Sequence, residues 1–186
     1  MRKIFLLAIV FQISLLSAQD LKFLDNNNGY KTYKFGKSPK ELNNIKRSSV
    51  SDEEFYTSKG IVEYVYTGDN LRYMFNSKIR KIVFLFIKNK LYGIGFSLGE
   101  LEKDYTLEEF NQMEESFTST FGKDYVLAKR NPAIVKSYIW KGEKVTLELS
   151  LLNLDYKTPK NRRLPKEGSI YIFHQKLNTE VYKSEF

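Results

Sequence analysis

The sequence predicts an α+β fold in which helices pack on an antiparallel sheet. Three observations predict it. Runs with alternating apolar and polar residues are separated by turn residues, two segments carry helix-capping boxes, and 186 residues suffice for one hydrophobic core. Because 42% of the residues are hydrophobic and 28% charged, the composition is that of a folded domain and not of a disordered tail.

The first 19 residues have the pattern of a secretory signal peptide. Arg2 and Lys3 are basic, residues 4–16 form an apolar run, and residues 17–19 (Ser-Ala-Gln) are small and polar. The alternative is a membrane anchor, but spanning a membrane needs about 20 mainly apolar residues, and this run is shorter. We therefore predict cleavage between residues 17 and 20, a secreted or periplasmic protein, and no membrane span in the mature chain.

The mature chain is predicted to contain a flexible entry and two similar units. Residues 20–29 are polar and rich in Asn, which predicts the flexible entry. The first unit covers residues 30–100 and the second covers residues 101–186. Each unit is expected to hold a capped helix and an antiparallel meander, so that the two meanders share one sheet and the helices lie on one face of it.

The first unit begins with a short strand and a capped segment. Ser38 is followed three residues later by Glu41, and Pro39 takes the first helical position, which predicts a helix of two to three turns. Residues 61–98 then alternate as strands, with turn residues at 68–70 and 88–90. This pattern predicts an antiparallel meander.

The second unit contains the clearest helix. Thr106 and Glu109 form a capping box, and Gly122 ends the pattern. The apolar positions follow at spacings of three and four: Leu107, Phe110, Met113, Phe117 and Phe121. A stripe of Met and aromatic residues can line a ligand site, but the core face of an amphipathic helix is the stronger interpretation. Strands are predicted at residues 137–141, 144–152 and 169–177.

Two pairs of segments predict that the units are copies of each other. Residues 38–45 (SPKELNNI) align with residues 106–113 (TLEEFNQM). Residues 64–75 (YVYTGDNLRYMF) align with residues 138–149 (YIWKGEKVTLEL), in the same order and at nearly the same offset. We therefore predict an internal duplication.

Tandem units of a helix and a meander, in an exported bacterial protein, resemble the β-lactamase inhibitor protein fold. The same unit occurs singly in small outer-membrane assembly lipoproteins. The resemblance covers residues 30–177 and rests on the order of the elements. The chain departs from both families, because it has no Cys for disulfides or for lipidation. The export signal is similar to that of Bacteroidetes secreted proteins.

Several kinds of chemistry are excluded by composition. Without Cys there is no disulfide, thiolate metal site or cysteine nucleophile, and a single His excludes sites that need two imidazoles. Ser97 lies in a Gly-x-Ser-x-Gly pattern with His174 downstream, as in serine hydrolases, but no helix follows it directly. We predict no cofactor, no metal and no catalytic activity, with a hydrolase as the third alternative.

The favoured function is non-catalytic binding by an open sheet face and a basic loop at residues 157–166. The candidate contact residues are Tyr64, Tyr66, Tyr138, Trp140, Arg162 and Arg163. Aromatic residues are also good strand formers, so the alternative is that these side chains belong to the core. The expected partner is a cell-envelope protein or an anionic glycan, and not a nucleic acid. The second candidate function is binding of a small apolar ligand in a pocket between sheet and helix.

Overall fold

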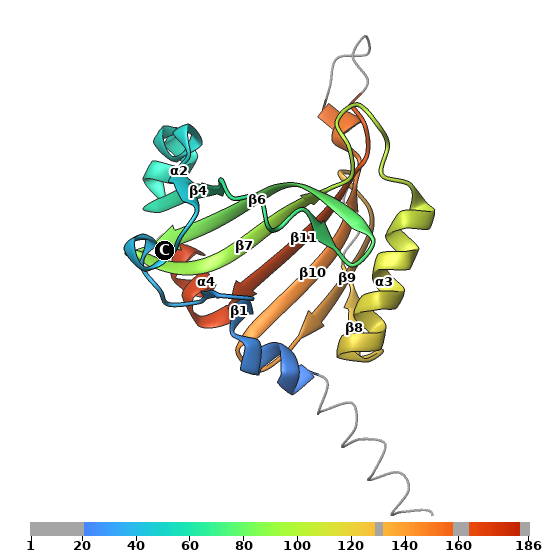
Figure 1. The fold of residues 1–186 in the computed structure, drawn as a ribbon, viewed down its shortest axis with the longest axis horizontal. Helices are drawn as coiled ribbons and strands as arrows, with labels where there is room; N and C mark the ends of the chain where they lie inside the picture. The colour runs from blue at the N-terminus through green and yellow to red at the C-terminus, as the bar shows by residue number, and fades with distance from the viewer. Residues whose placement is uncertain (1–20, 129–131, 158–163, 183–186) are drawn as a thin grey trace, which may run out of the picture.

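An antiparallel sheet of nine strands organises the described part of the chain, which in this computed structural model is residues 21–128, 132–157 and 164–182 (Figure 1). Its path runs β3 (Ile45–Arg47), β4 (Ile61–Tyr66), β6 (Ser77–Ile87), β7 (Lys90–Leu98), β11 (Glu167–His174), β10 (Val145–Leu152), β9 (Ile134–Lys141), β8 (Tyr125–Leu127). The short β5 (Tyr73–Met74) pairs with β6 beside this path. The predicted α+β class with a large antiparallel sheet is confirmed.

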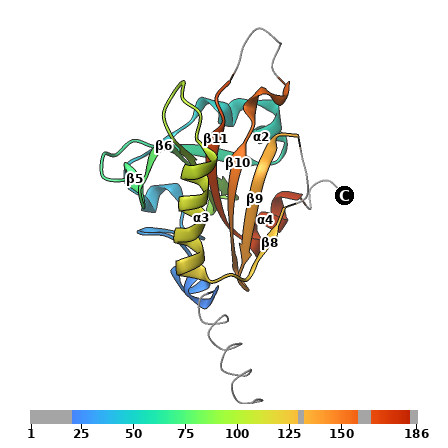
Figure 2. The ribbon, with the colours of Figure 1, turned by 90° about the vertical axis from the view of Figure 1, so that its right-hand side faces the viewer.

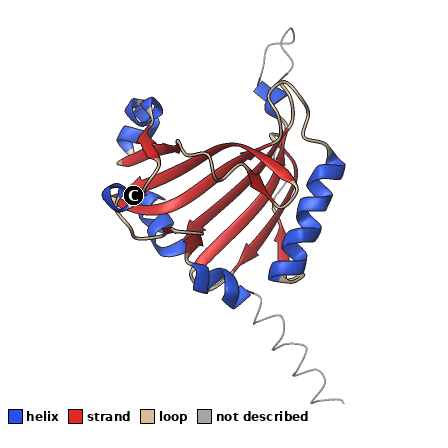
Figure 3. Ribbon diagram, viewed as in Figure 1, coloured by secondary structure: helices blue, strands red, loops and turns tan. Residues whose placement is uncertain are grey.

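Smaller elements surround the sheet (Figure 3). A separate hairpin is made by β1 (Gly29–Tyr30) and β2 (Tyr33–Lys34). The helices are α2 (Glu54–Ser58), α3 (Leu107–Phe121) and α4 (Gln175–Tyr182), and residues 21–27 are also helical. Single 3-10 turns occur at η1 (Pro39–Glu41), η2 (Ser49–Asp52) and η3 (Leu154–Lys157).

The strand order is symmetric about the middle of the sheet. Strands β3, β4, β6 and β7 follow one another from one edge to the centre. Strands β8, β9, β10 and β11 do the same from the other edge. The last strands of the two series, β7 and β11, pair antiparallel at the centre. Both series are meanders, because consecutive strands of each pair with one another.

Local residue chemistry accounts for the turns. Lys88 and Asn89 adopt positive φ angles of 47° and 64° between β6 and β7, the left-handed conformation that a two-residue hairpin turn requires. Strand β10 alternates as its sequence predicts. Val145, Leu147, Leu149 and Leu151 are buried on one face, whereas Thr146, Glu148 and Ser150 point to the other.

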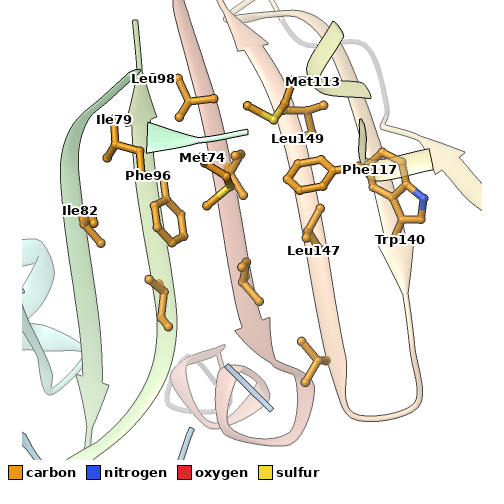
Figure 4. Packing of buried hydrophobic residues seen from close by; sticks show 14 of the residues in the cluster. Met74, Ile79, Ile82, Phe96, Leu98, Met113, Phe117, Trp140, Leu147 and Leu149 are labelled. Carbon is orange, nitrogen blue, oxygen red and sulfur yellow. The ribbon is translucent and has the colours of Figure 1, made fainter. Parts of the chain in front are cut away.

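Helix α3 forms as predicted. The Thr106 Oγ1 atom accepts the Glu109 N–H at 3.1 Å, and the Thr106 N–H donates to the Glu109 carboxylate at 2.7 Å. Gly122 ends the helix with φ 81°. Phe110, Met113, Phe117 and Phe121 are buried, whereas the first position of the predicted stripe, Leu107, is 54% exposed. Figure 4 shows Met113 and Phe117 over the strands that carry Leu147, Leu149 and Trp140.

The helices lie on both faces of the sheet, so the expectation that they share one face is wrong. Figure 2 shows α3 on one side of the strands and α2 and α4 on the other. On β4, Val62 packs against the main core together with α3. Its neighbour Ile61 packs against Val181 of α4 on the opposite face. Adjacent strand residues point to opposite faces, and each face of β4 carries an apolar residue, Val62 or Ile61, that is packed in a core cluster.

Three local expectations are also corrected. The capped segment at Ser38 makes only the single 3-10 turn η1, although the Ser38 N–H donates to the Glu41 carboxylate at 2.9 Å as in a capping box. Residues 175–177 begin α4 and do not extend β11. The entry at residues 20–29, expected to be irregular and flexible, contains a helix at residues 21–27 whose Leu24 side chain is only 2% exposed.

The helical entry segment is fastened to the sheet by one carboxylate. Asp25 accepts backbone hydrogen bonds from Glu143 at 2.7 Å and Lys144 at 2.8 Å in the turn between β9 and β10, and from Val145 at 2.8 Å at the start of β10. Any side chain at Gly142 would collide with it, since a Cβ there would lie 2.6 Å from an Asp25 oxygen. Residues 21–27 therefore form a fixed wall on the face that carries α3.

Candidate functional site

The best candidate site is a half-open apolar cavity of about 410 Å³ on the face that carries α3; we call it the aromatic groove. Its floor includes Leu147 of β10 and Ile172 of β11. Its walls come from three separate parts of the chain: residues 23–31, residues 73–75, and the C-terminal half of α3 with Phe117 and Phe121. A cavity of this size falls in the range of small-molecule sites.

Aromatic side chains stand exposed at the groove. Among the residues that line it, Phe23 is 52% exposed, Tyr73 is 60% exposed and Phe75 is 51% exposed. The Phe75 ring packs edge-on against Phe117 with centroids 5.5 Å apart, and the Phe23 ring lies 6.2 Å from that of Phe121. Buried and exposed rings therefore form one continuous apolar surface from the core to the solvent.

The charge inside the groove is low. Lys31 is the one charged side chain among its described lining residues, and its ammonium lies 5.5 Å from the centre of the Tyr30 ring. Burial raises the pKa of the Tyr30 hydroxyl, so this group stays neutral at physiological pH. The groove thus offers apolar contact and few polar partners.

A second, polar cavity of about 260 Å³ adjoins the groove, and Tyr73 lines both. We call it the polar pocket. It lies between residues 76–78, the loop at residues 99–105, and Glu109 and Gln112 of α3. Among its lining residues is the buried Tyr105, whose hydroxyl is hydrogen-bonded to Ser77 at 2.7 Å and donates to the Glu109 carbonyl at 3.2 Å. Burial raises the pKa of Tyr105.

The aromatic residues expected on an open sheet face belong to the core face. Trp140 is fully buried, and its indole N–H donates to the Gly122 carbonyl at 2.9 Å. Tyr138 is 7% exposed and stacks on Phe110, while Tyr64 and Tyr66 are half-buried against the same core. These side chains face the layer that contains α3, which explains why Tyr138 and Trp140 are not surface contacts. Arg162 and Arg163 lie outside the described residues.

The other face of the sheet carries a row of serines. Ser97, Ser169, Ser150 and Ser137 are direct cross-strand partners on β7, β11, β10 and β9. The Ser150 hydroxyl donates to Ser137 and also lies 2.9 Å from the Glu148 carboxylate. At the other end of the row, the Ser97 hydroxyl donates to Glu167 at 2.8 Å, and Arg80 pairs with the same carboxylate.

Ser97 and His174 do not meet. His174 pairs directly with the buried Val145, and its ring lies 6.1 Å from the ring of Phe35, so it is on the core face. Ser97 is on the opposite face, bonded to Glu167. Burial lowers the pKa of His174. The arrangement that a serine hydrolase needs, a hydroxyl and an imidazole within hydrogen-bonding reach, is not formed by this pair.

Within the described ranges, no three His, Asp or Glu side chains gather closely enough to hold a metal ion. The helices of that same part of the chain are all too short or too polar to cross a membrane.

Sequence reasoning missed most of the groove. Phe23 lies in the segment expected to be flexible, and Tyr73 and Phe75 lie in a segment expected to be an ordinary strand. The available signal was the pair of aromatics around Met74, which begins three residues after the polar turn at residues 68–70. For α3 the core interpretation is confirmed, although Phe117 and Phe121 also line the cavity.

Comparisons with protein-family models, curated proteins and solved structures found no significant match to this chain.

Proposed function

We propose that the protein is a non-catalytic binding protein that holds an apolar ligand in the aromatic groove. The observation that carries this proposal is the combination of a cavity of about 410 Å³ with two half-exposed phenylalanines, Phe23 and Phe75, at its walls. Large apolar side chains clustered beside a cavity are typical of sites that a ligand covers.

The groove supports this function better than the open sheet face does. The aromatic side chains that were candidates for the sheet face, above all Tyr138 and Trp140, are buried. The outer face instead carries the serine row and its charged neighbours Glu148, Glu167 and Arg80. Contact of the basic loop with an envelope protein or an anionic glycan stays a prediction from the sequence.

Export belongs to the same proposal. The first 19 residues support it with a basic start, an apolar run and a small polar end. Cleavage near residue 19 leaves Phe23 and Leu24 close to the mature N-terminus, and Asp25 holds that segment against the sheet. The groove wall formed by residues 23–31 is therefore part of the mature protein.

We also propose that the fold contains two related units. The symmetric strand order supports it, and so does the placement of the aligned Tyr64 and Tyr138 on β4 and β9, each the second strand from its edge. The alignment fails after these strands, because residues 71–75 leave the main sheet whereas residues 145–149 run through β10. The connection between β4 and β6 is about seven residues longer than the one between β9 and β10, which accounts for that failure, and it contains the groove wall at residues 73–75.

Binding of the neutral apolar dye N-phenyl-1-naphthylamine tests the ligand proposal. We expect the mature protein to enhance the dye's fluorescence with saturable, one-site binding. The double variant Phe23→Ala/Phe75→Ala should bind about thirtyfold more weakly, since each ring contributes roughly 1 kcal/mol of apolar contact. Phe55→Ala is the matched control, because Phe55 is 60% exposed but lies on α2, on the other face.

Dye binding by the two variants distinguishes the groove from other sites. Loss of dye affinity in the double variant with none in Phe55→Ala supports the groove. Equal losses in both variants, or no saturable dye binding by the folded wild type, contradict it. Circular dichroism of each variant shows whether it is folded.

A further inference from the structure

The aromatic groove and the polar pocket are neighbouring cavities with one wall residue in common, and we call the two together the cleft. Both cavities are lined by Tyr73, an amphipathic side chain that is 60% exposed between them. Along α3 the lining runs from Glu109 in the polar pocket to Phe121 in the groove, which at 1.5 Å per residue is about 18 Å. The cleft is long enough for a chain-like molecule.

The two walls of this cleft change from polar to apolar together. On the first wall, Asn76, Ser77 and Lys78 line the polar pocket and Tyr73, Met74 and Phe75 line the groove. On the second wall, Glu109 and Gln112 of α3 line the polar pocket, and Phe117 and Phe121 line the groove. The two walls are far apart in the sequence, yet both change from polar to apolar at the same place along the cleft. This arrangement fits one ligand that has a polar part and an apolar part.

The lining of the polar pocket indicates the head group of that ligand. Its charged lining residues are two lysines, Lys78 and Lys103, and three carboxylates, Glu100, Asp104 and Glu109. The lysines already lie near Glu100, at 3.8 Å and 3.9 Å, so the pocket holds no excess of positive charge for an anion. The exposed amides of Asn76 and Gln112 have no hydrogen-bond partner among the described residues.

The ammonium groups donate hydrogen bonds, the carboxylates accept them and the amides do both, although Glu109 already accepts from Thr106 and Asp104 from Lys166. Such a set suits a neutral head with many hydroxyl groups, because each hydroxyl both donates and accepts. A carboxylate head would meet a net negative surface, and a quaternary ammonium head has no hydrogen-bonding group to offer the two amides.

Resting on the proposed function, we infer that the ligand is a single-chain amphiphile with a neutral, polyhydroxylated head, as in a glycolipid. Its alkyl chain lies in the aromatic groove and its head lies in the polar pocket, past Tyr73.

The test uses three detergents with the same twelve-carbon chain, each below its critical micelle concentration. Dodecyl maltoside, dodecanoate and dodecyltrimethylammonium are titrated against bound N-phenyl-1-naphthylamine. We expect dodecyl maltoside to displace the dye at a concentration at least tenfold lower than either charged detergent. In the series octyl, decyl and dodecyl maltoside, affinity should rise about fourfold per methylene while the chain still finds apolar contact.

Two variants locate the head. Asn76→Ala/Gln112→Ala should weaken dodecyl maltoside about tenfold and leave dye affinity within twofold, because it removes hydrogen bonds in the polar pocket alone. Asn43→Ala is the control, an exposed amide outside both cavities.

Failure of this inference differs from failure of the proposed function. If the dye binds and all three detergents displace it equally, or if a charged detergent is preferred, the groove stands and the neutral head is rejected. A drop in dye affinity equal to the drop in maltoside affinity, in the amide variant, also rejects it. If the dye does not bind the folded protein at all, the proposed function fails first.

Discussion

The two faces of the sheet use the same strands but different side chains. On the face that carries α3, large rings and branched side chains such as Phe96, Leu147 and Trp140 are buried. On the other face, the serine row crosses four strands, and Gly93 and Gly95 leave room for the Tyr171 ring. Alternation along a strand fixes which residues share a face, but the layer packed above decides what that face becomes.

The covering layers also differ. Helix α3, residues 21–27 and the β5 region meet imperfectly above the sheet and leave the aromatic groove between them. On the other face α2 and α4 close a small, separate cluster around Ile61, Ile87 and Tyr92. The groove therefore forms where three separate segments converge on an apolar face of the sheet, and not within one unusual element.

The largest expected effect is at the centre of the core face. Trp140→Ala should lower the free energy of unfolding by about 3–5 kcal/mol, because it leaves a cavity against Phe117 and frees the Gly122 carbonyl. Urea denaturation followed by circular dichroism measures it. Trp140→Phe keeps most of the ring contact and should cost clearly less. Equal stability of Trp140→Ala and the wild type would show that this face is not the main core.

The next effect tests how firmly the covering layer is attached. Asp25→Ala removes the acceptor of three backbone N–H groups and should cost about 2 kcal/mol of unfolding free energy. Asp69→Ala is the control, since the Asp69 side chain is 92% exposed in a surface ion pair with Arg72 and should change stability little. An Asp25 variant as stable as the Asp69 variant would mean that residues 21–27 are held by apolar packing alone.

A neighbouring pair of residues compares the faces directly. Ser150→Ala should cost about 1 kcal/mol, because its hydroxyl bonds to Ser137 and Glu148 on the outer face. Leu149→Ala, one residue earlier and fully buried on the core face, should cost about 2–5 kcal/mol. The difference between the two is measured by urea denaturation under identical conditions. If the Ser150 variant lost as much unfolding free energy as the Leu149 variant, the two faces would contribute equally to stability.

The smallest effect is a pH dependence at a solvent-exposed cap. Lys37 and, after it, Ser38 lower the pKa of Glu41 to about 2 from an ordinary value near 4.5. Because the folded-state pKa is the lower one, the contribution of Glu41 to stability is complete above about pH 4.5 and is lost as the pH falls toward 2. An NMR titration of the Glu41 carboxyl carbon checks the value. Lys37→Ala should move the midpoint upward, and an unmoved midpoint would assign the shift to Ser38 alone.

Much of the fold could be predicted from local residue chemistry. Thr106, Glu109 and Gly122 define α3 because capping and a left-handed stop act within a few residues. The turn at Lys88 and Asn89 and the alternation in β10 are local in the same sense. The segment at Ser38 shows the limit, since a formed cap was followed by a single 3-10 turn and not by a helix.

The side of the sheet that each strand residue faces was harder to predict. In β9, Tyr138 and Trp140 alternate with Ser137 and Ile139, and both sets contain an apolar residue. The pattern therefore gives the two faces without saying which one α3 covers. For the same reason the sequence pattern did not show that α2 and α4 cover the face that was expected to be open.

The sequence by itself determined the antiparallel strands, the position and ends of α3 and its buried stripe, because these depend on residues at most a few positions apart. Only the tertiary structure decided which face each strand side chain occupies and that Phe23, Phe75 and Phe117 share one groove. Those relations join segments nearly a hundred residues apart, and they depend on how the layers pack rather than on any local pattern.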